Sequence, residues 1–250
     1  MSEQRIRIVV VERDIYARQA ITSYLSWDRR TRVVGAFSAP HELRAALKAD
    51  PGMGRLDAVM LDTSLASNPE SLAGLIKSII HHVPEADVIC LSHGANAEMA
   101  LTAARAGARG YLDREEVGIG LASAVRFIMW HLFVVTESVA EALGNCEEPP
   151  DIAYTPLPER RSYPRLTARI EQALWLCVVE GLPAERAAEE MGVSTSTVRS
   201  YIKEGYRILE AEDETVYPAQ ISPAERAFLR YSALDMEESP LVDAWGQPAA

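Results

Sequence analysis

The first half of the sequence alternates short apolar runs with segments that have the apolar periodicity of helices. The runs are rich in β-branched residues, as buried strands are, and the segments between them carry apolar residues at intervals of three and four positions. They read RIRIVVV, RVVGAF, DAVMLD, ADVICLS and ARGYL. Because strands joined by helices form parallel sheets with right-handed crossovers, the pattern predicts an α/β domain with a doubly wound, five-stranded parallel sheet.

A change of pattern near residue 145 marks the end of this domain. Five prolines and several acidic residues lie between Asn145 and Pro164, which is typical of a semi-rigid linker. Three helical patterns follow, with Thr167 as the predicted N-cap of the first and Ser194 as that of the third. A fourth lies at SPAERAFLRYSAL, where Ser222 and Glu225 fit a capping box. We therefore expect an α/β domain over residues 1–144, a linker over 145–164, an all-α domain over 165–234 and a flexible acidic tail over 235–250.

Charge and composition narrow the function classes. The net charge of -11 argues against a protein whose whole surface binds nucleic acid, but it is compatible with a local basic face. The three cysteines, Cys90, Cys146 and Cys177, are widely spaced, so we expect free thiols rather than disulfides or a zinc site. No signal peptide and no apolar run of membrane-spanning length is found, so we expect a cytoplasmic protein without membrane association.

Polar residues follow the predicted strands at the edge where open α/β sheets bind ligands. Glu12 and Arg13 come after the first strand, and Asp62 closes the third. Ser92 closes the fourth strand, and Arg114 follows the fifth. Because the carboxyl ends of parallel strands meet at one edge, we expect these five side chains to converge.

This half of the chain resembles the receiver domain of two-component response regulators, which has a flavodoxin-like fold, along its full length. Asp62 falls at the position of the aspartate that accepts a phosphoryl group in that family. Ser92 falls at the position of the hydroxyl residue after strand four, and Tyr111, in GYL, at the aromatic switch position. The resemblance implies a regulatory domain rather than an enzyme.

Two departures from the receiver pattern bear on metal binding. The family holds magnesium with an acidic pair, which here is Glu12 and Arg13, and its strand-five lysine is here Arg114. Magnesium usually relies on carboxylates, and a guanidinium beside the site repels a divalent cation. We therefore expect no cofactor, with Glu12, Asp62 and the Ser64 carbonyl as the ligands that could still approach magnesium.

Arg13 is predicted to replace the metal by pairing with Asp62. A carboxylate held in a bidentate arginine pair is already satisfied and is a poor phosphoryl acceptor. The alternative interpretation is a structural ion pair at a strand end without a regulatory role. Packing or helix capping also accounts for the other polar positions, namely Glu12, Asp14, Ser92 and Tyr111.

The second half contains the spacing of a helix-turn-helix. LPAERAAEEMG and STSTVRSYIKEGYRIL are predicted helices, separated by a turn at Gly192-Val193-Ser194. One face of the second helix is apolar, and the other carries short hydrogen-bonding side chains and cations. Such side chains bind phosphates and base edges. The predicted DNA-binding residues are Thr195, Ser196, Thr197, Arg199, Ser200 and Lys203.

The segment from Leu166 to Leu209 resembles the LuxR-type helix-turn-helix of NarL/FixJ response regulators. It has a Leu-Thr start, an EGL junction and the recognition pattern Val-Ser-x-x-Thr-Val-Arg. It departs from that family at Gly205, where an aliphatic residue is usual, and at EAEDE, which replaces a basic helix end. The same spacing also resembles region four of sigma factors, which binds promoter DNA.

The sequence thus favours a DNA-binding transcriptional regulator of the response-regulator type. It would bind double-stranded DNA as a homodimer, with a degenerate receiver controlled without magnesium-dependent phosphorylation. One alternative is a regulator similar to sigma region four, with RNA polymerase or another regulator as its partner. Another is a protein-interaction module in which the receiver or the helix-turn-helix is vestigial. A Rossmann-type enzyme is set aside because no G-x-G-x-x-G follows the first strand.

Overall fold

The computed structural model describes residues 5–146, 150–213, 215, 217 and 220–235. The chain divides into two compact units, Met1–Pro158 and Glu159–Ala250. Within the described residues, no helix has the length and apolar character needed to cross a membrane.

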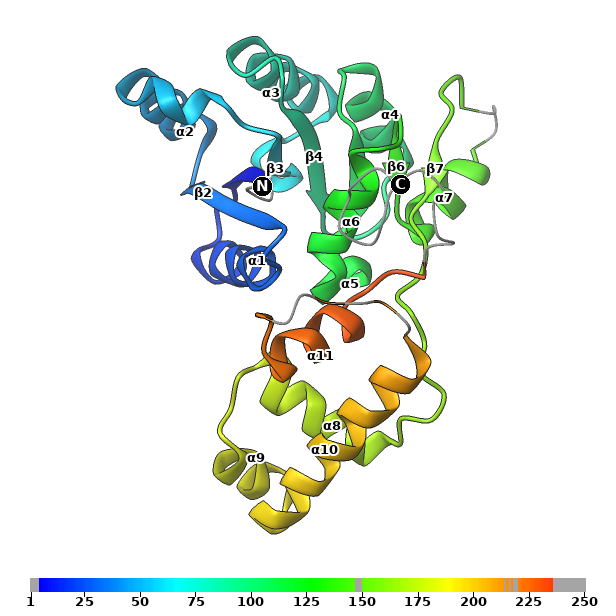
Figure 1. The fold of residues 1–250 in the computed structure, drawn as a ribbon. Coiled ribbons are helices and arrows are strands. Elements are labelled where there is room, and N and C mark those ends of the chain that lie inside the picture. Colours follow the sequence, from blue (N-terminus) through cyan, green and yellow to red (C-terminus); the bar gives the residue numbers. More distant parts are fainter. Residues whose placement is uncertain (1–4, 147–149, 214, 216, 218–219, 236–250) are drawn as a thin grey trace, which may run out of the picture. The chain divides into compact units, whose positions relative to one another are not determined.

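The first unit is built on one parallel sheet (Figure 1). Its strand order, β2-β1-β3-β4-β5-β6-β7, reverses direction at β1, as in flavodoxin-like folds. The side chains of the central strands are buried on both faces, which explains the continuous apolar runs in the sequence. The strands are β1 (Ile6–Val11), β2 (Thr31–Phe37), β3 (Ala58–Asp62), β4 (Asp87–Ser92), β5 (Gly110–Asp113), β6 (Val134–Val135) and β7 (Thr155–Pro156).

Helices cover both faces of this sheet (Figure 1). One face carries α1 (Ile15–Trp27) and α6 (Leu121–Ile128), which pack against each other. The other carries α2 (Pro40–Ala49), α3 (Pro69–His82), α4 (Ala97–Arg105) and α7 (Glu137–Gly144). Short helical turns lie at η1 (Pro51–Gly54), η2 (Thr63–Leu65), α5 (Arg114–Val117) and η3 (Gly118–Gly120). The predicted doubly wound architecture is confirmed.

Two strands beyond the predicted five extend the sheet. β6 and β7 are two residues long each, too short to produce a periodic signal in the sequence. β7 lies inside the predicted linker and pairs in parallel with β6, and Leu157 after it is buried. Pro156 is compatible with this position because β7 is an edge strand. The linker predicted over 145–164 is therefore wrong in its bounds, since part of it completes the sheet.

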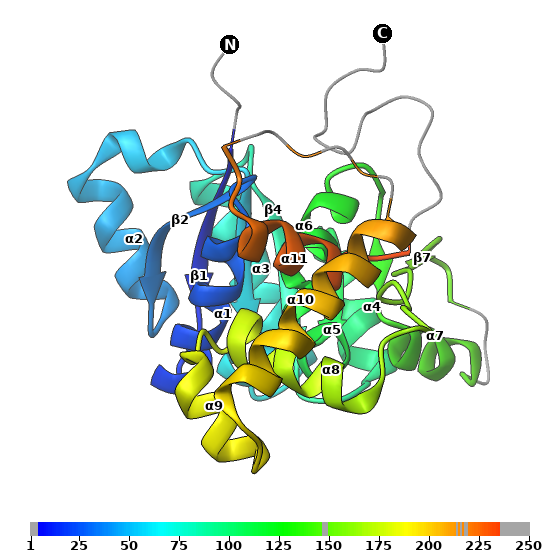
Figure 2. The same cartoon turned by 60° about the horizontal axis from the view of Figure 1, so that its bottom comes forward.

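The second unit consists of helices (Figure 2). Its first helix, α8 (Ala168–Leu174), continues into a π-helical turn, η4 (Trp175–Val179). The others are α9 (Ala184–Met191), α10 (Thr195–Glu212) and α11 (Pro223–Tyr231). The structure confirms the predicted N-caps at Thr167 and Ser194, and Ser222 forms the predicted capping box. Gly192 ends α9 in the left-handed region, with φ of 65°, where glycine carries no steric penalty.

An ion network fixes the outer limits of this helical unit. Asp213, the buried C-cap of α10, accepts from Arg161 Nη1 at 2.8 Å and faces Arg230 Nε at 3.3 Å. The Tyr163 hydroxyl donates to the Arg230 carbonyl at 2.9 Å. The chain before α8 and the helix α11 are thereby joined to the end of α10. The predicted start at residue 165 is therefore too late, and the predicted tail beyond Asp235 lies outside the described residues.

Candidate functional site

The first candidate site, the strand-end site, lies where the sheet changes direction, between the carboxyl ends of β1 and β3. Glu12 follows β1, and Asp62 is the last residue of β3. Strand pairing places the two ends side by side, because Val11 pairs with Leu61. Both carboxylates are buried, with exposed fractions of 2% for Glu12 and 1% for Asp62. Parallel α/β sheets bind ligands at this position.

Arg114 bridges the two carboxylates. Its Nη2 atom donates to Glu12 Oε2 at 2.8 Å and to Asp62 Oδ1 at 3.1 Å. The arginine opens α5 directly after β5, where Asp113 caps the helix by accepting from the Glu115 amide. Its side chain is 14% exposed, so the ion pairs are largely removed from solvent. One guanidinium thus holds the first and third strands' carboxylates together.

The other carboxylate oxygens are also satisfied. Glu12 Oε1 accepts from the Asp14 amide at 2.9 Å. Asp62 Oδ1 accepts from the Ser64 amide at 2.9 Å, and Asp62 Oδ2 accepts from the Ser64 hydroxyl. Burial and the nearby Asp62 charge raise the pKa of Glu12, while the Asp14 amide and Arg114 partly offset this.

The donor set does not fit a magnesium ion. Two carboxylates are present, and a guanidinium already occupies the point where a cation would bridge them. Magnesium needs several oxygen ligands in octahedral geometry, and the described residues contain no group of three acidic, histidine or cysteine side chains able to hold a metal. The amide and the hydroxyl of Ser64 both donate to Asp62, and these bonds satisfy Asp62 oxygens that a metal would need.

The prediction that Arg13 pairs with Asp62 is wrong. The Arg13 side chain is exposed, and the cation beside Asp62 comes from Arg114 instead. Arg13 lies beyond the end of β1, whereas Arg114 begins α5 directly after β5 and turns toward the two carboxylates. Asp14 caps α1 by accepting from the Tyr16 and Ala17 amides, each at 2.8 Å.

Ser92 and Tyr111 are both buried near this strand edge. The Ser92 hydroxyl donates to the Leu112 carbonyl of the neighbouring strand at 3.2 Å. Tyr111 belongs to the main apolar core, and burial raises the pKa of its phenol to about 12. These contacts are those of packed residues, and the roles implied by the receiver resemblance remain predictions.

The second candidate site is the exposed face of α10. α9 and α10 pack through small and apolar residues, including Ala187, Ala188 and Val198, which are buried in one cluster. A short turn separates the helices, with Ser194 accepting from the Thr197 amide at 3.1 Å. This is the geometry of a helix-turn-helix, in which the second helix presents its outer face to a groove of DNA.

The predicted DNA-binding residues divide into two groups. The side chains of four are exposed on the outer face: Ser196, Arg199, Ser200 and Lys203. Thr195 and Thr197 are half-buried, and the Thr197 hydroxyl lies 2.7 Å from Ser194 Oγ within the helix cap. The structure therefore places the exposed polar surface on the first two turns of α10 and on Lys203.

Three arginines of the helix-turn-helix pair with glutamates. Arg199 Nη2 donates to Glu185 Oε1 of α9 at 2.7 Å. Arg186 pairs with Glu189 at 2.7 Å, and Arg207 pairs with Glu204. Sequence reasoning missed Glu185, because nothing in the spacing indicates a contact across 14 positions and two helices. The alternating charge on α9 is the only hint.

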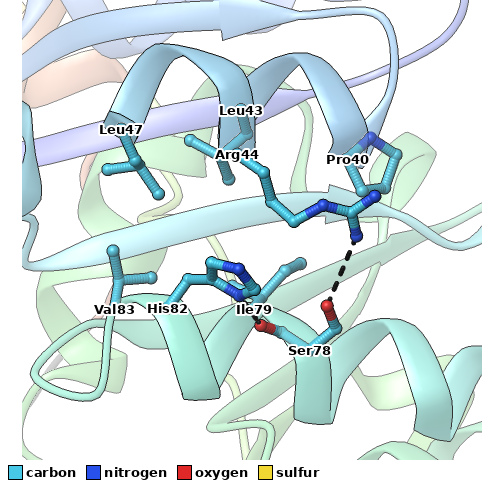
Figure 3. Close-up of a pocket in the computed structure, with 8 residues that line it drawn as sticks. All are labelled: Pro40, Leu43, Arg44, Leu47, Ser78, Ile79, His82 and Val83. Carbon is cyan, nitrogen blue, oxygen red and sulfur yellow. Dashed lines mark hydrogen bonds between the residues drawn. The ribbon is translucent and has the colours of Figure 1, made fainter. Parts of the chain in front are cut away.

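A shallow groove between α2 and α3 lies apart from both sites (Figure 3). Leu43, Leu47, Ile79 and Val83 give it apolar walls. Arg44 reaches across it to the Ser78 hydroxyl at 3.4 Å. None of the residues that line it belongs to the strand-end site or to the helix-turn-helix.

Comparison with known proteins agrees with this two-part architecture. The family model of Sigma-70, region 4 matches residues 164–209. A structure of the two-component response regulator RcsB-DNA complex is 18% identical, with a TM-score of 0.50, and the match covers 90% of this chain and 98% of that chain. RcsB of Salmonella typhimurium is 19% identical over 84% of this chain and 94% of that chain, with a TM-score of 0.50.

A structure of two RcsB dimers bound to two parallel DNAs is also similar, with 18% identity and a TM-score of 0.50. The match covers 80% of this chain and 90% of that chain. No curated protein matches the sequence. At these identities the likeness concerns the fold, which is a receiver-like α/β unit followed by a helix-turn-helix unit.

Proposed function

We propose that this protein binds double-stranded DNA through α10 and regulates transcription as a response regulator does. The observation that carries the proposal is the helix-turn-helix itself, with a buried apolar face and an exposed face of hydroxyls and cations on α10. The match to region 4 of Sigma-70 and the likeness to an RcsB-DNA complex support it. Arg199 supplies the fork of donors suited to a guanine edge, and Lys203 supplies a phosphate contact.

The charge distribution favours recognition of particular sequences over general attachment to DNA. The chain has a net charge of -11, and Arg186, Arg199 and Arg207 are each neutralised by a glutamate. Attraction to phosphates supplies most non-specific affinity, so this surface has little of it. Binding then depends on base contacts and on two-fold pairing of subunits over a palindromic site. The dimers in the RcsB-DNA structure support this pairing.

We further propose that the receiver-like unit acts without magnesium-dependent phosphorylation of Asp62. In-line phosphoryl transfer needs a cation that bridges the acceptor and the phosphate oxygens. Arg114 neutralises Asp62 and Glu12 from a fixed position, and Ser64 occupies the remaining Asp62 oxygen. The unit is thereby held in one state by an internal cation, and its input is a protein contact or the concentration of the protein itself.

Region 4 of sigma factors supplies a second candidate function. The matched residues, 164–209, cover α8 to α10. This alternative predicts stable association with core RNA polymerase in the absence of DNA. The response-regulator proposal predicts DNA binding by the protein alone.

The proposal is tested by selection from a pool of DNA duplexes with a randomised central segment. The wild-type protein should enrich a symmetric sequence and should bind it more tightly than it binds unselected duplexes. Arg199→Ala should relax the preference at one position by about 1–3 kcal/mol, whereas Lys203→Ala should weaken binding to all sequences. Arg207→Ala is the control, because this arginine lies later on α10 and is paired with Glu204. Failure to enrich any sequence would overturn the proposal.

A further inference from the structure

The ion pair between Glu185 and Arg199 connects the two helices of the helix-turn-helix. Glu185 lies in the first turn of α9, and Arg199 lies in the second turn of α10. The Arg199 Nη2 atom donates to Glu185 Oε1 at 2.7 Å. Each side chain is anchored on a helix whose packing is fixed by the buried cluster around Ala187 and Val198. The guanidinium is therefore oriented relative to both helices.

Stability of the fold does not account for this pair. The side chains are 67% and 59% exposed for Arg199 and Glu185, and exposed ion pairs contribute little to folding. Glu185 is already favoured at its position by the start of α9, where a carboxylate interacts well with the free amide groups. The other glutamate pair of α9, Arg186 with Glu189, stays within one helix and away from α10.

The geometry leaves Arg199 ready for a base edge. The contact to Glu185 uses one Nη2 donor, and a guanidinium has five N–H donors in a rigid plane. A free arginine must lose side-chain freedom when it binds, and an arginine held in advance loses less. The carboxylate next to it also repels phosphate oxygens, so it disfavours use of Arg199 as a backbone contact.

We propose that Glu185 is a specificity-determining positioning residue, which holds Arg199 toward a base edge of DNA and opposes its use on phosphate. This role of Glu185 rests on the DNA binding proposed above. It means that α9 as well as α10 contributes to the choice of DNA sequence. Removal of the Glu185 charge should therefore weaken binding to the preferred sequence and strengthen binding to other sequences.

The test compares Glu185→Gln with Glu189→Gln. Both changes remove one negative charge from the exposed face of α9, and both carboxylates accept from one arginine at 2.7 Å. Dissociation constants are measured for the duplex selected by the wild-type protein and for a scrambled duplex of equal length. Glu185→Gln should lower the ratio of the affinity for the selected duplex to the affinity for the scrambled duplex by roughly 3- to 10-fold, which is part of the discrimination that a bidentate base contact supplies. Glu189→Gln should leave the ratio unchanged.

Two further variants separate positioning from charge. Glu185→Asp keeps the charge but shortens the side chain, so it should lower the ratio without strengthening binding to the scrambled duplex. In an Arg199→Ala background, Glu185→Gln should have no effect on the ratio. An unchanged ratio in Glu185→Gln, or an equal change with and without Arg199, would overturn the role. If the wild-type protein prefers no sequence, the proposed function itself fails, which is a different result from a preference that Glu185 does not affect.

Discussion

Gly205 of α10 lies so close to Leu174 of α8 that a Cβ atom at position 205 would be 2.9 Å from the leucine Cγ and from both of its Cδ atoms. Glycine in the middle of a helix is normally unfavourable by about 1 kcal/mol relative to alanine. Here it lets α8 and α10 approach each other closely, and Gly205 is buried at the contact. The departure from the usual aliphatic residue is thus explained by packing between the two helices.

Gly205→Ala should destabilise the helical unit by about 1–2 kcal/mol, because overpacking of a filled core outweighs the gain in helix propensity. The free energy of unfolding from urea melts measures this. Gly74→Ala is the matched control: Gly74 lies inside α3, and a Cβ atom added there would have no neighbour within 4 Å. That change should stabilise the protein by about 0.5–1 kcal/mol. Stabilisation by both alanines would contradict the close packing of α8 and α10.

Glu12→Gln should change how stability depends on pH. Burial raises the pKa of Glu12 in the folded state above its ordinary value of 4.5, so folding favours the protonated side chain. The stabilisation that protonated Glu12 gives the folded state is complete at pH values below its ordinary pKa. It is lost as pH rises through the raised pKa of the folded state. Relative to the wild type, the neutral glutamine variant should therefore become more stable as pH increases over this range.

Asp28→Asn serves as the opposite case for the same measurement. The Asp28 carboxyl is buried, but interactions with Arg30 lower its pKa below the ordinary value of 3.8. The ionised Asp28 carboxylate therefore stabilises the folded state at pH values above its ordinary pKa. This stabilisation is lost as pH falls through the lower pKa of the folded state. Relative to the wild type, the asparagine variant should thus be least stable at neutral pH. If both variants showed the same trend with pH, the assigned environment of Glu12 would be incorrect.

A fragment that ends at Pro158 should be more stable than one that ends at Gly144. The longer fragment retains β7, whose neighbours Tyr154 and Leu157 are half-buried and buried, respectively. Burial of these side chains is worth about 2–4 kcal/mol. Thermal melts of the two purified fragments measure the difference, and limited proteolysis of the whole chain should leave β7 on the larger product. Equal stability would show that β7 is dispensable.

Sequence patterns predicted the larger features of the fold because their causes are local or periodic. Buried strands and amphipathic helices have characteristic spacings, and the caps at Thr167, Ser194 and Ser222 follow from side-chain chemistry within one turn. β6 and β7 were missed because two residues carry no periodicity, and their pairing depends on tertiary contact.

The strand-end site was predicted in its location but not in its pairing. The carboxyl ends of parallel strands lie at one edge of the sheet, and this does not depend on the conformation of the turns. The convergence of Glu12, Asp62 and Arg114 therefore follows from the topology. Which arginine reaches Asp62 depends on side-chain direction: Arg13 follows a buried residue and is exposed, whereas Arg114 turns inward from the start of α5. The Glu185–Arg199 pair likewise depends on how α9 and α10 pack.

Incubation with acetyl phosphate and magnesium, followed by intact mass measurement, tests directly whether Arg114 takes the place of the metal. The wild-type protein should gain no phosphoryl group, since the guanidinium satisfies Asp62 and Glu12 without offering open coordination sites. The double variant Arg13→Asp with Arg114→Lys restores both positions of the receiver pattern and should gain one phosphoryl group, which Asp62→Asn abolishes. A stoichiometric, Asp62-dependent mass increase in the wild-type protein would contradict the role assigned to Arg114.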